Sequence, residues 1–361
     1  MVETRQVAQF SIPFRSYLGR DGQELATLPA SWSDPDGLAA LYRGMVFARA
    51  FDQQAIQLQR TGKLGTYASS LGQEAVGVGV AAAMREDDVL VPSFREHGAL
   101  LWRGVSPVEL FLYWGGDERG SNYEACRQDF PISVPVGSQF PHGAGVALAL
   151  SMDGNSQASV TLGGDGSTSK GDFYEALNIC GAWRLPAVFV IANNCWAIST
   201  SHVVQTAAET LAQKAIAAGL PGEQVDGNDV IAVADAVDRA LSRARDGGGA
   251  TLIEALTYRL SDHTTADDAR RYRDEAEVTE RWALEPLRRM RSWLVAREAW
   301  NTEQEEALLH DCADRVEKAV NDYLAIPPQA PEAMFDHLFA ELPMPLHSQR
   351  VRLGRRGQSD G

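Results

Sequence analysis

The chain of 361 residues is long enough for one large α/β domain or two smaller ones, and its 45% hydrophobic content can build a sizeable core. The formal net charge of −15 argues against binding to duplex nucleic acid or to an anionic membrane, because both require a basic protein face. No apolar run approaches the roughly 18 residues of a membrane-spanning helix, and the N-terminus lacks the pattern of a signal peptide, so we expect a cytoplasmic protein.

The first part of the chain predicts an extended arm and then a series of helices. Residues 1–35 contain proline and glycine without a regular apolar period and predict an extended N-terminal arm. Apolar residues at helical spacing then predict one long helix that ends near Gly62. Further helices are expected within 71–84, 94–104, 106–116 and 137–152, with a short buried strand near 89–91.

Two of these helices are rich in small residues. The stretches "EAVGVGVAAAM" (74–84) and "PHGAGVALAL" (141–150) consist largely of glycine, alanine and valine. Small side chains allow helix backbones to approach closely, which is useful in a packed interior and at a subunit interface. Both interpretations remain open for both helices at this stage.

The centre of the chain has the clearest pattern, a strand, a helix and a second strand. Residues 158–164 form a β-rich run that ends in glycine, and 187–192 form a continuous apolar strand. Between them, residues 172–183 predict a helix with a capping box formed by Asp172 and Glu175. Its buried stripe is expected to contain Phe173, Ala176, Leu177, Cys180 and Trp183.

The same alternation continues to the end of the domain. Helices are expected over 207–219 and 229–246, and strands near 223–227 and 251–260. This pattern predicts an α/β fold whose sheet is mostly parallel, with helices on both faces. We expect the domain at 36–300, followed at 301–361 by a helical C-terminal segment and a tail.

Polar side chains follow the two central strands. Asp165 stands between Gly164 and Gly166, and Asn194 follows Asn193 directly after the second strand. Ligands of open parallel sheets gather at the carboxyl ends of the strands, so adjacent strands could bring these residues together. Carboxylate and amide oxygens suit Mg²⁺, which often completes its coordination with phosphate oxygens, so the pattern predicts a Mg²⁺-bound diphosphate.

Other phosphate-binding motifs fit less well. A dinucleotide fingerprint would require a third glycine after Gly164 and Gly166, and none is present. A Walker loop would require Ser or Thr after Lys170, where this chain has Gly171. Gly-Asp-Gly is also a common turn, so only its combination with the two asparagines is specific.

Gly-Asp-Gly after one strand and Asn-Asn after the next resemble the thiamine-diphosphate motif. The rest of the chain resembles the α subunit of the 2-oxo acid dehydrogenase component of pyruvate and branched-chain complexes, over roughly residues 35–300. The blocks that carry this resemblance, in the order of that family, are "GTYASSLGQEAVGVG", "SFREHGALLWRG", "VPVGSQFPHGAGVALAL", "GDFYEALN", "NNCWAIST", "GEQVDGNDV" and "TLIEALTYRLSDHTTADDARRYR".

The resemblance implies a binding site for thiamine diphosphate and Mg²⁺. Asp165, Asn194 and the backbone oxygen of Trp196 would be the Mg²⁺ ligands, with Gly166 beside the diphosphate. Arg95 would hold the diphosphate with its planar guanidinium. Phe94 stands where many relatives have a tyrosine, so one hydrogen bond to the phosphates is in doubt.

The other end of the cofactor and the reacting carbon involve different segments. By the resemblance, the backbone around Val134 and Val136 would receive the aminopyrimidine, with Val136 near the bend of the cofactor. His263 matches an active-site histidine in a mobile loop, and Asp262 stands where branched-chain relatives have a second histidine. The polar segment 261–274 has the composition of a lid.

The chain offers no recognised carboxylate for the aminopyrimidine, and in the family this group comes from a Glu of a separate β subunit. The resemblance therefore implies an α₂β₂ heterotetramer that decarboxylates a 2-oxo acid and passes the acyl group to the lipoyl arm of an acyltransferase. Pyruvate is the favoured substrate, and a branched-chain 2-oxo acid or acetoin stays open. A non-catalytic regulatory subunit is an alternative from another class, whereas a single-chain enzyme of transketolase type would need a second α/β domain.

Overall fold

Six parallel strands form the central sheet of the computed structural model, which describes residues 2–154, 156–336 and 338–357. Their order across the sheet is β1-β7-β8-β4-β3-β2, and every neighbouring pair is parallel. A short antiparallel hairpin stands apart from the sheet. The strands are β1 (Phe14–Arg15), β2 (Val89–Val91), β3 (Ser159–Gly164), β4 (Ala187–Asn193), β7 (Gly222–Asp226) and β8 (Thr251–Leu256), and the hairpin is β5 (Trp196–Ala197) and β6 (Thr200–Ser201).

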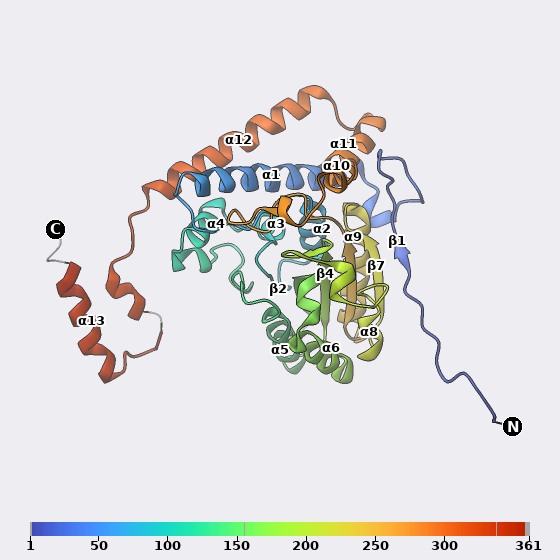
Figure 1. The fold of residues 1–361 in the computed structure, drawn as a ribbon, viewed down its shortest axis with the longest axis horizontal. Helices are drawn as coiled ribbons and strands as arrows, with labels where there is room; N and C mark the ends of the chain where they lie inside the picture. The colour runs from blue at the N-terminus through green and yellow to red at the C-terminus, as the bar shows by residue number, and fades with distance from the viewer. Residues whose placement is uncertain (1, 155, 337, 358–361) are drawn as a thin grey trace.

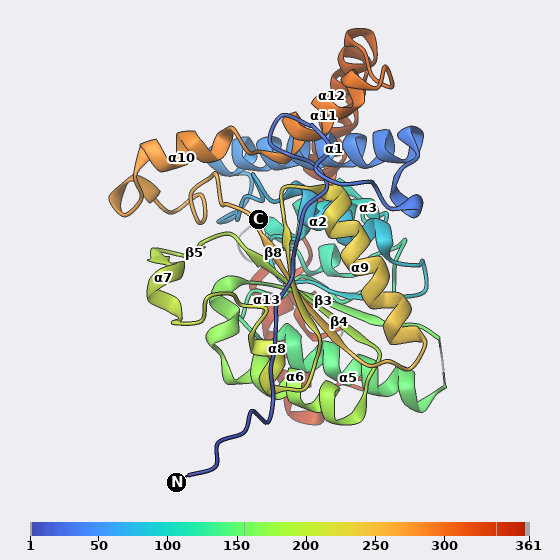
Figure 2. The same ribbon diagram turned by 90° about the vertical axis from the view of Figure 1, so that its right-hand side faces the viewer.

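Helices cover both faces of the sheet, which confirms the predicted fold class (Figure 2). The β4 side chains alternate between two apolar clusters: Val188 and Val190 join one, whereas Phe189 and Ile191 join the other. Such strands are apolar throughout because neither face meets water. One side carries α1 (Pro35–Arg60), α2 (Glu74–Ala83), α3 (His97–Trp102) and α9 (Val230–Arg245), and the other carries α5 (Gln139–Met152), α6 (Gly171–Trp183) and α8 (Lys214–Ala217).

The central β3-α6-β4 unit forms as predicted, with corrections at both ends of its helix. Phe173, Ala176, Leu177 and Cys180 are buried, but Trp183 is 60% exposed because the helix ends there and the chain turns away through a left-handed residue. The predicted capping box is wrong: α6 begins at Gly171, one residue before Asp172, and no side chain caps it. The helix expected over 207–219 is also wrong in length, since only α8 is helical.

The small-residue helix α2 packs inside the subunit. A methyl group added at Gly77 would lie 3.0 Å from the Ala99 nitrogen of α3, and one at Gly79 would lie 3.0 Å from the Val233 side chain of α9. Its small residues are therefore explained by close packing between helices of the same chain. The outer face of α5 is different, because a methyl group at Gly145 would meet no atom within 4 Å.

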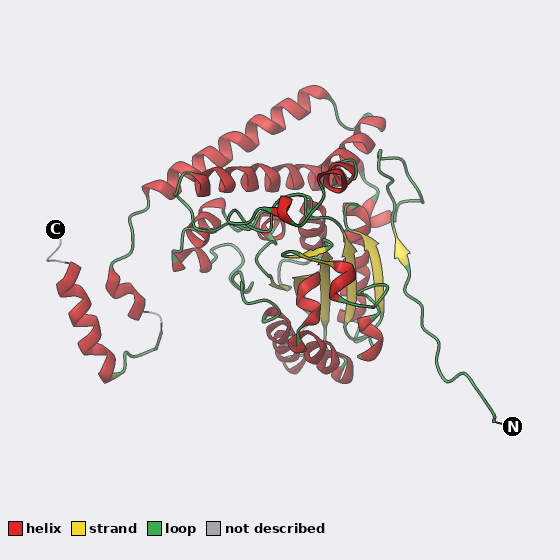
Figure 3. Ribbon diagram, in the orientation of Figure 1, coloured by secondary structure: helices red, strands yellow, loops and turns green. Residues whose placement is uncertain are grey.

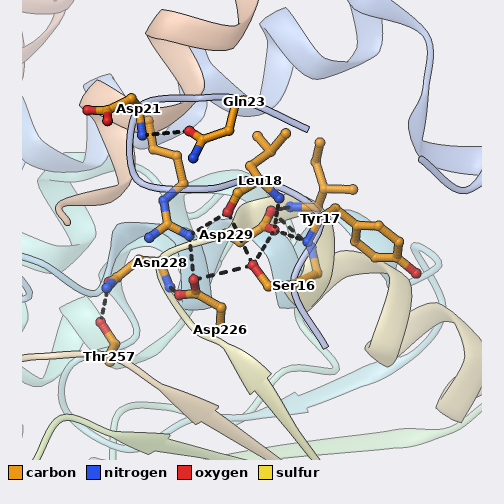
Figure 4. Close-up of polar contacts among 12 residues, drawn as sticks. Ser16, Tyr17, Leu18, Asp21, Gln23, Asp226, Asn228, Asp229 and Thr257 are labelled. Carbon is orange, nitrogen blue, oxygen red and sulfur yellow. Dashed lines mark hydrogen bonds and ion pairs between the residues drawn. The ribbon is translucent and has the colours of Figure 1, made fainter. Parts of the chain in front are cut away.

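The N-terminal arm joins the sheet through β1, which pairs with β7. The carboxylate of Asp229 anchors the residues that follow β1 and accepts hydrogen bonds from the backbone N–H groups of Tyr17 (2.7 Å) and Leu18 (2.8 Å) (Figure 4). The same carboxylate caps α9 through the N–H groups of Ile231 and Ala232. One side chain thus connects the arm to the start of a core helix.

Helices α10 (Glu275–Trp282), α11 (Pro286–Ala296) and α12 (Thr302–Ala325) lie together along the top of the molecule in the view of Figures 1 and 3. The long helix α12 packs along α1, whereas α13 (Met344–Gly357) lies away from the sheet (Figure 1). The other helices are α4 (Pro107–Trp114) and α7 (His202–Gln205), with 3₁₀ turns η1 (Ala30–Trp32), η2 (Glu118–Ser121), η3 (Asp165–Ser169), η4 (Ala269–Arg271) and η5 (Pro331–Phe335). The division at residues 36 and 300 stays a prediction, and the last four residues of the tail lie outside the described part of the chain.

Within the described residues, no helix is both long and apolar enough to cross a membrane.

Candidate active site

A cavity of about 220 Å³ lies where β3 and β4 end. These strands are neighbours, and Gly164 at the end of β3 pairs with Ala192 of β4, so Asp165 and Asn194 leave the sheet side by side. The prediction that adjacent strands bring the two residues together is confirmed. The cavity is lined by Gln73, Ser93, Phe94, Arg95, Glu96, Ser133, Val136, Gln139, Gly164, Asp165, Gly166, Ser167, Ala192, Asn194, Trp196, Ala197, Ile198 and His263.

The two asparagines at the end of β4 have different partners. Asn193 turns into the protein, where its amide donates a 2.6 Å hydrogen bond to the buried carboxylate of Glu254 on β8. Asn194 lines the cavity, and its Nδ2 donates to Gln73 Oε1 at 3.2 Å. Asn193 therefore ties neighbouring strands together, whereas Asn194 is available to the site.

The loop after Asn194 has a strained backbone. Cys195 and Ile198 adopt positive φ values of 70° and 55°, which non-glycine residues rarely do. The buried guanidinium of Arg259 holds this loop by donating to the carbonyl oxygens of Ile198 (2.9 Å) and Trp196 (3.3 Å). The Trp196 carbonyl, one of the predicted metal ligands, is thus directed by a side chain from beyond β8.

Asp165 begins η3 and is only 2% exposed, so it is more buried than its position in a turn suggested. Its Oδ2 accepts a 2.6 Å hydrogen bond from Nε2 of Gln205 on α7. Burial raises the pKa of Asp165, although the Gln205 hydrogen bond opposes this shift. A cation beside the carboxylate would offset the cost of burying its charge.

Arg95 and His263 meet across the cavity. Arg95 Nη2 donates to His263 Nδ1 at 2.8 Å and to the His263 carbonyl oxygen at 2.6 Å, while Nη1 donates to the Ser69 carbonyl oxygen at 2.6 Å. Because Nδ1 accepts from a cation, a neutral His263 ring carries its proton on Nε2. Burial, together with the charges of Arg95 and Arg259, lowers the pKa of His263 to about 4.

The other predicted residues divide into those that line the cavity and one that does not. The Phe94 ring packs edge-on against the His263 ring, with centroids 6.1 Å apart. Gly166 has no room for a side chain, since an added methyl group would lie 2.7 Å from the Ala197 side chain. Val136 lines the cavity, whereas Val134 is not among the lining residues.

Comparison with known proteins identifies the family. A family model described as the dehydrogenase E1 component matches residues 42–332. The chain belongs to this family. Its members are thiamine-diphosphate-dependent 2-oxo acid dehydrogenases, and a cavity of this kind at the carboxyl edge of the sheet is therefore the expected place for that cofactor.

Individual relatives resemble the chain over most of its length. The α subunit of pyruvate dehydrogenase E1 from Bacillus subtilis is 39% identical over 87% of this chain and 85% of the relative. The α subunit of 3-methyl-2-oxobutanoate dehydrogenase from Mycobacterium tuberculosis is 42% identical over 87% of this chain and 85% of the relative. The corresponding pyruvate dehydrogenase subunit of Staphylococcus aureus is 39% identical over 86% of this chain and 85% of the relative. The chain is thus an α subunit of a 2-oxo acid dehydrogenase.

The side chains around the cavity could hold a diphosphate. Arg95 is buried beside Arg259, and burial followed by the charge of Arg259 lowers the pKa of Arg95 to about 10, so the Arg95 guanidinium stays protonated at neutral pH. Two buried cations that repel each other are stabilised by an anion between them. Buried Gln73 Nε2 and Gln139 Oε1 have no hydrogen-bond partner among the described residues, which leaves them available to a polar ligand.

The oxygen donors also suit a divalent cation that shares its coordination with phosphate. One carboxylate (Asp165), one amide (Asn194) and one main-chain carbonyl (Trp196) are hard ligands of the kind Mg²⁺ prefers. No group of three or more His, Cys, Asp or Glu side chains suited to a metal occurs in the described residues. A cation here would therefore need ligand oxygens or water to complete its coordination.

Several residues of the site were not singled out from the sequence. Gln73 and Arg259 stand in blocks that carry the family resemblance, but their side-chain roles follow only from three-dimensional contacts. Glu96, next to Arg95, is a second carboxylate in the cavity. Gln205 reaches Asp165 from 40 positions away, and no local pattern signals it.

Proposed function

We propose that this chain is the α subunit of a pyruvate dehydrogenase and holds the diphosphate end of thiamine diphosphate through Mg²⁺. The observation that carries the proposal is the convergence of Asp165, Asn194, Arg95 and His263 on one cavity. A regulatory subunit that does not catalyse a reaction would not need all four of these residues, so their presence together supports a catalytic role.

The residues have separate roles in this proposal. Asp165, Asn194 and the Trp196 carbonyl would hold Mg²⁺, and Arg95 would donate to the diphosphate. When bound, thiamine diphosphate supplies the ylid that attacks the 2-oxo group and accepts the electrons released by decarboxylation. His263, whose Nε2 carries the proton, would donate a hydrogen bond near the reacting carbon and assist acyl transfer to a lipoyl group.

The site lacks a free carboxylate for the aminopyrimidine. Two carboxylates among the described residues line the cavity, Asp165 and Glu96. Asp165 is assigned to the metal, and Oε2 of Glu96 accepts a 3.0 Å hydrogen bond from the backbone N–H of Arg95. Glu96 therefore stands at the diphosphate end, whereas Val136 would mark the aminopyrimidine end. We propose that a β subunit supplies the missing carboxylate in an α₂β₂ assembly.

The exposed outer face of α5 is where we propose that a partner subunit packs. Pro141, His142, Gly145 and Ala149 are exposed there, and the space above Gly145 is open. A partner helix could approach closely at Gly145 and Ala149, where the side chains are small. The acyl product would pass to the lipoyl acyltransferase of the same complex.

The second candidate substrate is 3-methyl-2-oxobutanoate. It is favoured by the 42% identical relative from Mycobacterium tuberculosis, whose name specifies that substrate, while pyruvate is specified by the relatives from Bacillus subtilis and Staphylococcus aureus. Acetoin is the third compound to compare. Pocket size would depend in part on the β subunit.

The test is to assay the chain alone and together with its β subunit, with saturating Mg²⁺ and thiamine diphosphate. We expect no decarboxylation by the isolated chain and activity on assembly, with the highest kcat/KM for pyruvate among the three substrates. Robust activity of the isolated chain would contradict the shared site and would direct attention to Glu96. A higher kcat/KM for 3-methyl-2-oxobutanoate or acetoin would overturn the substrate assignment alone.

A further inference from the structure

Asp52 of α1 is a buried carboxylate outside the cavity. It is 1% exposed, and its partners in the described part of the chain are neutral hydrogen-bond donors. Its Oδ1 accepts hydrogen bonds from the Tyr67 hydroxyl (2.8 Å) and the Ser70 N–H (2.7 Å), and its Oδ2 accepts one from the Ser69 hydroxyl (2.6 Å). All of these donors belong to residues 67–70, so one carboxylate holds a four-residue irregular stretch of the chain.

The hydrogen-bond directions around Tyr67 follow from its neighbours. The Tyr67 hydroxyl has a single proton, which it donates to Asp52, so at its 3.3 Å contact with His97 Nδ1 it accepts. His97 Nε2 in turn accepts from Trp114 Nε1 at 3.0 Å. A neutral His97 with its proton on Nδ1 satisfies both contacts, and burial lowers the pKa of His97 to about 3, consistent with that form.

Residues 67–71, which we call the Asp52-bound segment, contact both sides of the proposed site. The Ser69 carbonyl accepts the 2.6 Å hydrogen bond from Arg95. The Tyr67 backbone exchanges two hydrogen bonds with Thr265 of the 261–274 segment: Tyr67 N–H donates to Thr265 Oγ1 (3.0 Å), and Thr265 N–H donates to the Tyr67 carbonyl (2.9 Å). The segment therefore fixes the guanidinium and the loop that carries His263 relative to each other.

We infer that Asp52 is a positioning residue, which holds the Asp52-bound segment so that Arg95 and the His263 loop are preorganised for the cofactor. The inference rests on the proposed function, because it treats the cavity as the thiamine-diphosphate site. An ionised carboxylate accepts hydrogen bonds at both oxygens, which matches the donors around it. An asparagine of the same shape would turn an NH₂ group toward at least one of those donors and loosen the segment.

The first experiment compares Asp52→Asn with Asp88→Asn in the enzyme assembled with its β subunit. Asp88 is also fully buried and is paired with Arg245, but it directly precedes β2, at the amino ends of the strands and away from the cavity. We expect Asp52→Asn to raise the Kd and the KM for thiamine diphosphate about tenfold, with kcat at saturating cofactor within about threefold of the unmodified enzyme. Asp88→Asn should lower the melting temperature while leaving that KM within about twofold. Two outcomes would overturn the inference. One is an equal change in the KM for thiamine diphosphate in both variants, and the other is an unchanged Kd and KM in a folded Asp52→Asn enzyme.

A second experiment reads the loop directly and needs no cofactor. Trypsin cleavage after the exposed residues Arg270 and Arg271 reports opening of the 261–274 segment. We expect Asp52→Asn and Thr265→Val each to be cleaved at least about fivefold faster than the unmodified chain. Thr265→Val removes the hydroxyl that accepts the hydrogen bond from the Tyr67 N–H. Thr264→Val should be cleaved at the unmodified rate, because within the described residues the Thr264 hydroxyl accepts only a local 3.3 Å hydrogen bond from the Ala266 N–H.

Combining Asp52→Asn with Thr265→Val tests whether both act through the same segment. We expect the double variant to be cleaved little faster than the faster single variant, since either change releases the same contact. Unchanged cleavage in the single variants, or fully multiplicative effects in the double variant, would contradict the inference. If the unmodified enzyme fails to bind thiamine diphosphate, the proposed function falls, while these cleavage rates still decide the role of Asp52.

Discussion

Two buried aspartates at the same edge of the sheet make an instructive comparison. Asp165 follows β3 and Asp229 lies three residues after β7, and both stand close to a glycine. Burial raises the pKa of each. Both are strand-end aspartates of the kind that can bind a ligand, yet only Asp165 lines the cavity.

The difference lies in how each carboxylate is satisfied. Asp229 accepts hydrogen bonds from four backbone N–H groups, two from the arm and two from α9, and it is enclosed by the arm (Figure 4). Asp165 has Gln205 as its side-chain donor, and the other amide atom of Gln205, Oε1, is buried without a partner in the described part of the chain. A carboxylate satisfied by four backbone donors is structural, whereas one held by a side chain that itself has an unpartnered polar atom is available to a ligand.

The largest effect is expected at Asp165. Asp165→Ala should weaken Mg²⁺-dependent binding of thiamine diphosphate by more than about a hundredfold, since even residues that support a metal ligand contribute about 10- to 100-fold. Calorimetry with thiamine diphosphate and Mg²⁺ measures this, and circular dichroism verifies the fold. Unchanged cofactor affinity in the folded variant would show that Asp165 is not a metal ligand. Asp165 would then not differ from Asp229 in its role.

His263 should affect chemistry and leave stability nearly unchanged. His263→Ala should reduce acyl transfer to lipoamide by about a hundredfold, which is the usual scale for a positioned acid–base group. The melting temperature should change little, because the ring lies at the cavity wall. If turnover stays near normal in an assay of lipoamide acylation, His263 is an ordinary loop residue.

Asp229 should show the opposite behaviour to Asp165. Asp229→Ala removes a helix cap and the anchor of the arm together, which should lower the free energy of unfolding by about 2–3 kcal/mol. At a temperature where the variant is folded, its affinity for thiamine diphosphate should stay within about twofold of the unmodified protein. Urea unfolding and calorimetry measure the two quantities, and a strong loss of affinity would break the division between the two aspartates.

The smallest effect concerns the protonation of His263. Its pKa of about 4 in the folded protein lies below the value of about 6.5 expected on unfolding, so its contribution to stability is present at neutral pH and is lost as the pH falls from about 6.5 toward about 4. Without cofactor, the rate constant for its reaction with diethyl pyrocarbonate should therefore be independent of pH between about 5.5 and 8. A rate that falls with a midpoint near 6.5 would show that burial and the nearby guanidiniums do not lower the pKa of His263.

The βαβ centre of the fold follows from the sequence because its period is strong and local. The apolar stripe of α6 and the continuous apolar run of β4 are confirmed, since helices must bury one face and central strands both. Trp183 was assigned to the same stripe but is exposed, because a period does not reveal where a helix ends relative to its neighbours. The cap at Asp172 was wrong for the same reason: α6 begins one residue earlier.

Much of the candidate site also follows from the sequence, since its residues stand in recognisable blocks. The sequence predicts Phe94, Arg95, Asp165, Asn194 and His263 as site residues, and all five line the cavity. The contacts that direct them were not predictable. Nothing in the local sequence indicates that Gln205 meets Asp165 or that Arg259 meets the Trp196 carbonyl, because these contacts join segments separated by 40 and 63 positions.

By itself, the sequence determined the parallel α/β fold, the family and the residue types at the strand ends, because these depend on apolar period and on short motifs. Only the tertiary structure decided that Asn193 binds Glu254 while Asn194 faces the cavity, that α2 packs internally, and that Asp52 supports the Arg95 and His263 segments together. The physical reason is that burial and hydrogen-bond satisfaction depend on neighbours brought together by folding. Two aspartates beside glycines at one sheet edge can thus look alike in sequence, while their surroundings make one an anchor and leave the other open to a ligand.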